Sequence, residues 1–182
     1  MDIKNQYSYI IKIISYFILG TASIIILIYS VFGWHIDFIN VIETAISIST
    51  VLFILYEKWL WQYDPFNNTP VLSNTYNGVI KYNHSKGLGK KAINVKVKQS
   101  LLWISITLKT DEISSFVTSA SIVTECNEKI LYYTYITNPK SGVINKNPIN
   151  RGCVRLVIEN KNSLKGQYWT ASGTYGDIEF FI

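Results

Sequence analysis

Two long apolar stretches at the start of the chain constrain its fold more than any other feature. They cover Ile13–Val31 and Phe38–Tyr56, which are 19 residues each. At a rise of ~1.5 Å per residue, a helix of this length crosses the ~30 Å hydrocarbon core of a bilayer. The first stretch is longer than the apolar core of a signal peptide, and no small-residue cleavage motif follows it. We therefore predict a transmembrane hairpin in residues 1–62, with spans at about 9–32 and 38–57.

The lysines around the hairpin indicate its orientation. Lys4 and Lys12 precede the first span and Lys58 follows the second, whereas the turn at 33–37 has no Lys or Arg. Basic residues that flank a span tend to stay on the cytoplasmic side of the membrane. The sequence therefore predicts that both termini are cytoplasmic and that only the short turn lies outside.

Glu43 is an unusual residue for the interior of an apolar segment. Ser47 and Thr50 follow it at i+4 and i+7, so the three side chains share one helix face. A carboxyl group in hydrocarbon is costly and normally faces protein or water. Two interpretations stay open. Either the three residues form the polar seam of an oligomer, or Glu43 lies shallow enough to reach the interface and does little.

The basic charge of the chain lies entirely in its C-terminal part. Residues 1–61 carry three Lys and four acidic residues, whereas residues 62–182 carry 14 basic and eight acidic residues. The two net charges, −1 and +6, sum to the +5 of the whole chain. A basic domain beside a membrane can contact anionic headgroups or an anionic ligand. Ordinary solvated lysines explain the charge equally well, because no basic run exceeds Lys90–Lys91.

From Val71 onward the hydrophobic pattern has period two, which is typical of antiparallel strands with one face toward a core. Turn signals separate eight such runs, near 73–82, 92–99, 101–109, 115–124, 129–137, 151–159, 164–173 and 176–182. Eight short strands can form a sandwich or close into a barrel, and closure removes the exposed edges. We therefore expect residues 63–182 to be an all-β domain, an eight-stranded antiparallel meander β-barrel.

The chain lacks the residue sets of the common enzyme classes. It has no GxSxG, HExxH, Walker or GxGxxG motif, and neither His35 nor His84 has paired acids nearby. Cys126 and Cys153 form no metal-binding motif, and we expect them to be free thiols in a reducing compartment. The sequence therefore predicts a binding protein that is not an enzyme and uses no cofactor or metal.

Aromatic and hydroxyl side chains are abundant in the predicted strands. Tyrosine faces can stack on bases, and hydroxyl and arginine side chains can donate hydrogen bonds to phosphates. Tyrosine and threonine are also ordinary strand formers, so the composition alone favours a purely structural role.

A series of short motifs gives the chain a resemblance to a known family. The last is Leu164-x-Gly166-x-Tyr168-Trp169-Thr170-x-x-x-Thr174-x-Gly176-x-Ile178, and the earlier ones are Thr75-Tyr76-x-Gly78, Val97-x-Gln99-Ser100, Thr110-x-x-x-Ser114-Ser115 and Leu131-x-Tyr133-x-Tyr135-x-x-x-Pro139. With the two spans before them, these motifs resemble the two-transmembrane, β-strand-rich effectors of bacterial CBASS anti-phage systems. Such effectors are encoded beside a nucleotide-cyclising enzyme, the CD-NTase.

The resemblance implies a minimal eight-stranded barrel that binds a cyclic dinucleotide from the cognate CD-NTase, with no nucleic-acid polymer as a partner. It also implies an inner-membrane protein that oligomerises on binding and disrupts the membrane lipid, which kills the infected cell. Two positions depart from the family pattern: Tyr76 stands where Trp is usual, and Ser172 stands where a basic residue is usual. Arg151 or Arg155 would then have to meet the phosphate charge.

The resulting hypothesis assigns a role to each candidate residue. Tyr76, Tyr133, Tyr135 and Tyr168 would stack on bases or shape the lumen; Thr110, Ser115, Thr170 and Ser172 would bond sugar or phosphate; Arg151 and Arg155 would meet phosphate; and Glu43, Ser47 and Thr50 would act in the membrane or oligomer. A register error of one residue would turn a whole strand face outward. Two other functions stay open, a membrane-tethered barrel carrying an apolar ligand such as a fatty acid, and a constitutive membrane assembly module.

Overall fold

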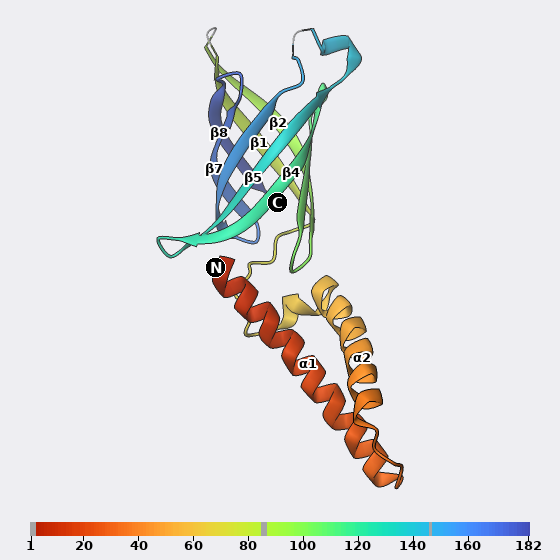
Figure 1. Cartoon of the computed structure of the whole chain (residues 1–182). Helices are drawn as coiled ribbons and strands as arrows, with labels where there is room; N and C mark the ends of the chain where they lie inside the picture. The colour runs from red at the N-terminus through yellow and green to blue at the C-terminus, as the bar shows by residue number, and fades with distance from the viewer. Residues whose placement is uncertain (1–2, 85–86, 146) are drawn as a thin grey trace. The chain divides into compact units, whose positions relative to one another are not determined.

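A computed structural model describes residues 3–84, 87–145 and 147–182 (Figure 1). The chain divides into two compact units, one ending at Asn67 and the other beginning at Asn68. The first unit contains two long helices and a short 3-10 helix, and the second contains strands and one further 3-10 helix, η2 (Ser141–Val143).

The two apolar stretches form the helices α1 (Ile3–Val31) and α2 (Phe38–Lys58). Both are long and apolar enough, by length and composition, to cross a membrane. The chain reverses between them at Gly33, whose φ of +66° favours a residue without a Cβ. Asp37 then begins α2 by accepting a hydrogen bond from the backbone N–H of Ile39 at 3.0 Å.

One face of α2 packs against α1 through small and polar side chains. The buried residues of α2 are Val41, Ala45, Ser49 and Tyr56, whose spacing places them on one side of the helix. Thr21 of α1 meets this face: its hydroxyl lies 2.8 Å from the Ser49 hydroxyl and 3.3 Å from the Ala45 carbonyl oxygen. Small residues allow such close approach of two apolar helices.

A second polar contact ties the two helices to the segment that follows them. After α2 comes the 3-10 helix η1 (Leu60–Tyr63), and Asp64 follows it directly. The Asp64 carboxylate accepts hydrogen bonds from the phenols of Tyr9 and Tyr56, each at 2.6 Å. Polar contacts therefore join α1 and α2 in the middle of the pair, through Thr21 and Ser49, and at the end opposite the α1–α2 turn, through Tyr9, Tyr56 and Asp64.

The second unit is a closed barrel of eight antiparallel strands, which confirms the predicted fold (Figure 1). Consecutive strands are neighbours, as in a meander, and β1 pairs with β8 from Asn77↔Phe181 to Asn83↔Tyr175. The strands are β1 (Thr75–His84), β2 (Gly87–Gln99), β3 (Ile104–Lys109), β4 (Ile113–Glu125), β5 (Glu128–Pro139), β6 (Arg151–Asn160), β7 (Ser163–Thr170) and β8 (Tyr175–Phe181).

Several strand ends differ from the sequence-based expectation. The second strand, expected to start near residue 92, already begins at Gly87, because Gly87 to Gly89 pair with β1. The third strand begins at Ile104 because Ser100–Trp103 close a turn, with a 2.8 Å hydrogen bond from the Ser100 N–H to the Trp103 carbonyl. Strand β7 ends at Thr170, since Gly173 takes a φ of +83° in the turn that follows.

Inward-facing side chains fill one half of the barrel. Leu131, Leu156 and Leu164 are fully buried there together with Phe180, which packs against the ring of Tyr76. These residues lie toward the end of the barrel where β1 begins. The other half carries smaller or polar inward residues, so the core seals one end and leaves space at the other.

Removal of the Phe180 ring tests this assignment of the core. Phe180 is 1% exposed and its neighbour Phe181 is 43% exposed, so the two rings point to opposite faces of β8. We expect Phe180→Ala to lower the free energy of unfolding by about 3–5 kcal/mol, because it leaves a cavity. Phe181→Ala should change it by less than about 1 kcal/mol. Denaturant unfolding measures both, and equal effects would contradict the assignment.

Candidate ligand-binding site

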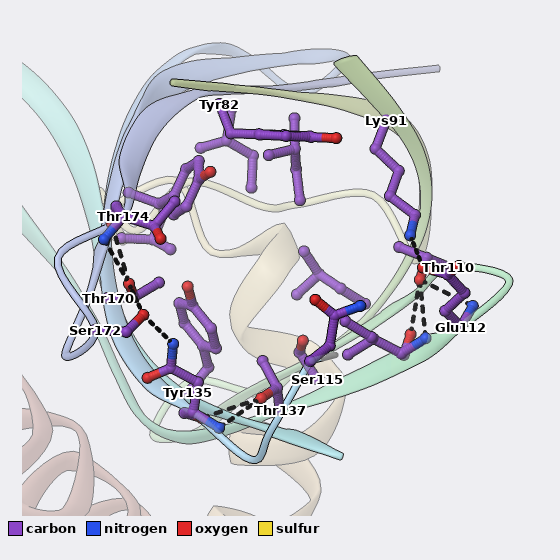
Figure 2. Close-up of a pocket in the computed structure, with 18 of the residues that line it drawn as sticks. Tyr82, Lys91, Thr110, Glu112, Ser115, Tyr135, Thr137, Thr170, Ser172 and Thr174 are labelled. Carbon is purple, nitrogen blue, oxygen red and sulfur yellow. Dashed lines mark hydrogen bonds and ion pairs between the residues drawn. The ribbon is translucent and has the colours of Figure 1, made fainter. Parts of the chain in front are cut away.

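A cavity of about 610 Å³ occupies the half of the barrel that the core leaves open. It lies at the end where the strands connect in the pairs β1–β2, β3–β4, β5–β6 and β7–β8, opposite the end where β1 begins. Its volume falls within the ~300–1,000 Å³ of small-molecule sites. Figure 2 shows its walls, with polar side chains around the rim and tyrosine rings inside.

Three tyrosine rings lie close to the cavity wall because the neighbouring strand has glycine opposite each of them. A Cβ would meet a ring atom at 2.2 Å at Gly89 and 2.6 Å at Gly152, whereas at Gly176 it would meet the Lys81 carbonyl oxygen at 2.0 Å and the Tyr168 ring at 3.0 Å. The pairs are Tyr82 with Gly89, Tyr135 with Gly152, and Tyr168 with Gly176. The glycines therefore keep the lumen wide and present aromatic surfaces to it.

Tyr133 has the only buried side-chain polar atom without a hydrogen-bond partner among the described residues. Tyr133 lines the cavity and also belongs to the core cluster, and its hydroxyl is buried where these two regions meet. Leaving a buried hydroxyl unpaired costs free energy of about 1–3 kcal/mol. Such a group is a natural partner for a polar atom of a bound molecule.

Burial keeps the cavity phenols protonated. Desolvation raises the pKa of Tyr168 to about 12 and also raises the pKa values of Tyr133 and Tyr135, with nearby phenols adding to the effect. The three groups are therefore neutral O–H donors at physiological pH. Neutral phenols can donate hydrogen bonds to an anion without adding negative charge to the site.

Three threonines at the ends of strands close the loops around the rim. The Thr110 hydroxyl accepts the Ile113 N–H at 2.9 Å, and the Thr170 hydroxyl accepts the Thr174 N–H at 3.0 Å. The Thr137 hydroxyl accepts the N–H of Asn150 at 2.8 Å. Their hydroxyls are thus occupied by the local turns, as the dashed lines in Figure 2 show.

The end of the β5–β6 connection lines the mouth of the cavity. Asn147, Pro148, Ile149 and Asn150 contribute to the wall. The Asn150 side-chain amide donates to the Ser172 hydroxyl at 2.6 Å, which joins this connection to the β7–β8 turn. Ser172 is therefore held by a contact within the protein.

Two charged side chains line the cavity among the residues described, Lys91 and Glu112. They form an ion pair, with 2.6 Å between the Lys91 Nζ and the Glu112 Oε2. Lys91 extends from β2 on the lumen side, and Glu112 lies in the β3–β4 turn that Thr110 closes (Figure 2).

The structure brings seven of the ten predicted ligand residues together in this cavity: Thr110, Ser115, Tyr133, Tyr135, Tyr168, Thr170 and Ser172. The other three lie elsewhere. Tyr76 is at the sealed end of the barrel, where its hydroxyl accepts the Ser73 N–H and donates to the Lys161 carbonyl. Arg151 and Arg155 alternate with buried Gly152 and Val154, so they face outward, and Arg155 contacts Tyr132 and Glu125 there.

The prediction from sequence missed Lys91, Glu112 and Tyr82. Lys91 precedes Ile93 by two residues, so the alternation of Ile93, Val95 and Val97 places it on the inner face once β2 is extended. Placing the start of this strand at residue 92 assigned Lys91 to a turn. Glu112 had no such signal, because its position depends on how the β3–β4 turn folds over the rim.

The three polar residues of the predicted membrane face lie on the side of α2 away from its buried line. Glu43, Ser47 and Thr50 are all exposed in this chain. The Ser47 hydroxyl donates to the Glu43 carbonyl at 2.9 Å, and the Thr50 hydroxyl donates to the Ile46 carbonyl at 2.8 Å. The helix backbone thus satisfies both hydroxyls, and the Glu43 carboxyl points away from α1.

Comparison with known proteins places the chain among its relatives. Residues 67–181 match the family model described as Cap15, cyclic dinucleotide receptor domain. The chain is also 37% identical over 178 residues to CD-NTase-associated protein 15 of Staphylococcus schleiferi, with 96% of each protein covered. The resemblance noted in the sequence motifs is therefore confirmed, and the chain belongs to the Cap15 family of CBASS effectors.

Proposed function

We propose that the barrel cavity of this chain binds a cyclic dinucleotide and that binding activates the helical hairpin in the inner membrane. The observation that carries the proposal is a cavity lined by tyrosine rings, one of which, Tyr133, has a buried hydroxyl without a hydrogen-bond partner. Such a wall combines stacking surfaces with a donor that lacks a partner. The family description names the same class of ligand for the domain that this barrel matches.

The chemistry of a cyclic dinucleotide suits this cavity. Its two bases can stack on the rings of Tyr82, Tyr135 and Tyr168, and each stacked base contributes ~1–3 kcal/mol. Its phosphodiester oxygens accept hydrogen bonds, which the neutral phenols and Lys91 can donate. The alkyl chain of a fatty acid has no polar atom for the Tyr133 hydroxyl or for the hydroxyl and amide side chains of the rim, and covering polar groups without bonding them is unfavourable. The proposed activity is therefore recognition of a signalling nucleotide, with no catalytic step.

The hairpin supplies the proposed output. We place α1 and α2 across the inner membrane with both termini in the cytoplasm, which agrees with the distribution of lysines around the spans. The α1–α2 contact uses Thr21, Ala45 and Ser49, whereas Glu43 is on the other side of α2. This outer face is then available to a second copy of the chain, and ligand-driven assembly through it would disrupt the bilayer and kill the infected cell.

Ligand binding is tested first by thermal unfolding of the full chain in detergent, with cyclic di-AMP, cyclic di-GMP, cyclic di-UMP and cyclic GMP–AMP as probes. At 100 times its dissociation constant, a ligand of the native state adds ~2.7 kcal/mol to stability. We expect one or more of these probes to raise the unfolding temperature, and a linear dinucleotide to serve as the control. The absence of any shift across the panel would argue strongly against the proposal.

Tyr133→Phe tests the role of the unpaired hydroxyl. Without ligand, the variant should be as stable as the parent or more stable by about 1 kcal/mol, because an unsatisfied buried group is removed. With ligand, its affinity should fall by about tenfold, because one hydrogen bond to the bound molecule is lost. Calorimetric titration measures the affinity.

Tyr76→Phe is the matched control for this variant. It deletes a hydroxyl that makes two hydrogen bonds at the sealed end of the same barrel. It should therefore lower stability and leave the ligand affinity unchanged. Equal losses of affinity in the two variants would remove Tyr133 from the site.

Glu43→Leu tests the proposed membrane face. The substitution should keep ligand binding, since the cavity lies in the other unit, and should reduce ligand-triggered dye release from vesicles by several fold. Glu43→Gln, which stays polar and can hydrogen-bond, should lose less. Unchanged dye release in the leucine variant would show that Glu43 takes no part in assembly.

A further inference from the structure

We infer that the Lys91 ammonium changes partners when the ligand binds: it separates from the Glu112 carboxylate and pairs with a phosphodiester of the bound molecule. Glu112 then competes with the ligand for Lys91 and so limits the binding affinity. The inference rests on the proposed function and goes beyond it, because it assigns opposite roles to two residues of the cavity wall. It starts from the charges that face the lumen.

The described part of the cavity wall carries one cation and one anion, so its formal charge is zero. A cyclic dinucleotide carries one negative charge on each of its two phosphodiesters. A neutral wall offers such a dianion no net attraction while the cation stays bound to a carboxylate. The basic residues on the outer face do not change this, because Arg155 points away from the lumen and pairs with Glu125.

The geometry lets the lysine move more easily than the carboxylate. Glu112 belongs to a tight turn in which its own N–H donates to the Thr110 hydroxyl at 3.3 Å, and its carbonyl accepts the Lys140 N–H at 2.9 Å. Lys91 reaches the pair on a four-carbon stem from a strand whose lumen face it shares with Ile93. The turn therefore holds Glu112 at the rim, whereas the Lys91 ammonium can turn from the rim into the cavity.

The pair is also exposed enough to open. The side chains are 33% exposed for Lys91 and 46% exposed for Glu112. An ion pair in contact with solvent contributes little to stability, so separating its partners costs the fold little. A lysine that leaves it keeps three N–H donors for phosphodiester oxygens, and hydrogen bonds between charged partners are the stronger ones.

The test measures the dissociation constants of the full-length variants Lys91→Met and Glu112→Gln by calorimetric titration with the four cyclic dinucleotides named above. Partner exchange predicts opposite signs. Lys91→Met should weaken binding by about tenfold or more, because a charged hydrogen bond to phosphate is lost. Glu112→Gln should strengthen binding by about three- to tenfold, because the competing charge is removed and Lys91 is released.

A merely structural ion pair predicts a different result. If the pair only shapes the rim, both variants break it and both should weaken binding. If Glu112 contacts a base, Glu112→Gln should weaken binding as well. Either result, or unchanged affinity in both variants, would overturn the inference and leave the proposed function intact. Failure of the parent chain to bind any of the four probes would overturn both.

The outer face of the barrel offers a matched control. Lys81 and Glu179 form an ion pair at 2.7 Å with similar exposure, outside the cavity. Glu179→Gln should leave the dissociation constant unchanged, which separates the cavity effect from the loss of one negative charge. Should Lys91→Met fail to fold, the sign of the Glu112→Gln effect still decides: tighter binding supports the exchange, and equal or weaker binding rejects it.

Discussion

The pairing of β1 with β8 is the contact on which the rest of the receptor unit depends. It closes the meander, so that every strand sends alternate side chains into one shared interior and no edge remains for another chain to pair with. The interior of an eight-stranded barrel is about wide enough to be filled by side chains. Whether it is filled is decided residue by residue. Large aliphatic side chains such as Leu131 and Leu156 seal one half, and glycines opposite tyrosines leave the other half open.

The half of the barrel that contains the cavity has several features that lower the stability of the fold. Gly89 and Gly152 lose more conformational freedom on folding than a residue with a side chain would, and in return they let tyrosine rings lie against the wall. The Tyr133 hydroxyl is buried without a partner, which native proteins seldom tolerate. The Lys91–Glu112 pair at the rim adds little stability. A binding role accounts for all of these features together, whereas a purely structural barrel would gain from filling the space with apolar side chains.

The helical unit uses one face of α2 for an observed contact and leaves another face exposed. Thr21 and Ser49 hold α1 and α2 together on one face of α2, and Glu43 faces away from that contact. One face of α2 contacts α1 and another face is exposed. A helix pair that assembles with further copies of the chain needs both kinds of face. The Cap15 family membership gives this arrangement its context, since a receptor domain of that family follows the hairpin in the same chain. The receptor domain and the unit with the proposed output thus occupy consecutive segments of very different composition.

The sequence by itself determined the two apolar helices, the number of strands and the barrel as the expected closure, because apolar length and period-two alternation are local properties of a chain. It also singled out seven of the residues that line the cavity, through motifs that share strand parity. Only the tertiary structure decided how far along the barrel axis each inward-facing side chain lies and where each strand ends. Tyr76 and Tyr82 share one face of β1, yet the register with β2 and β8 places one in the core and the other in the cavity. Lys91 lies on the lumen side because hairpin pairing with β1 extends β2 beyond its predicted start. The Tyr133 hydroxyl is buried without a partner only once the strands of the barrel surround it.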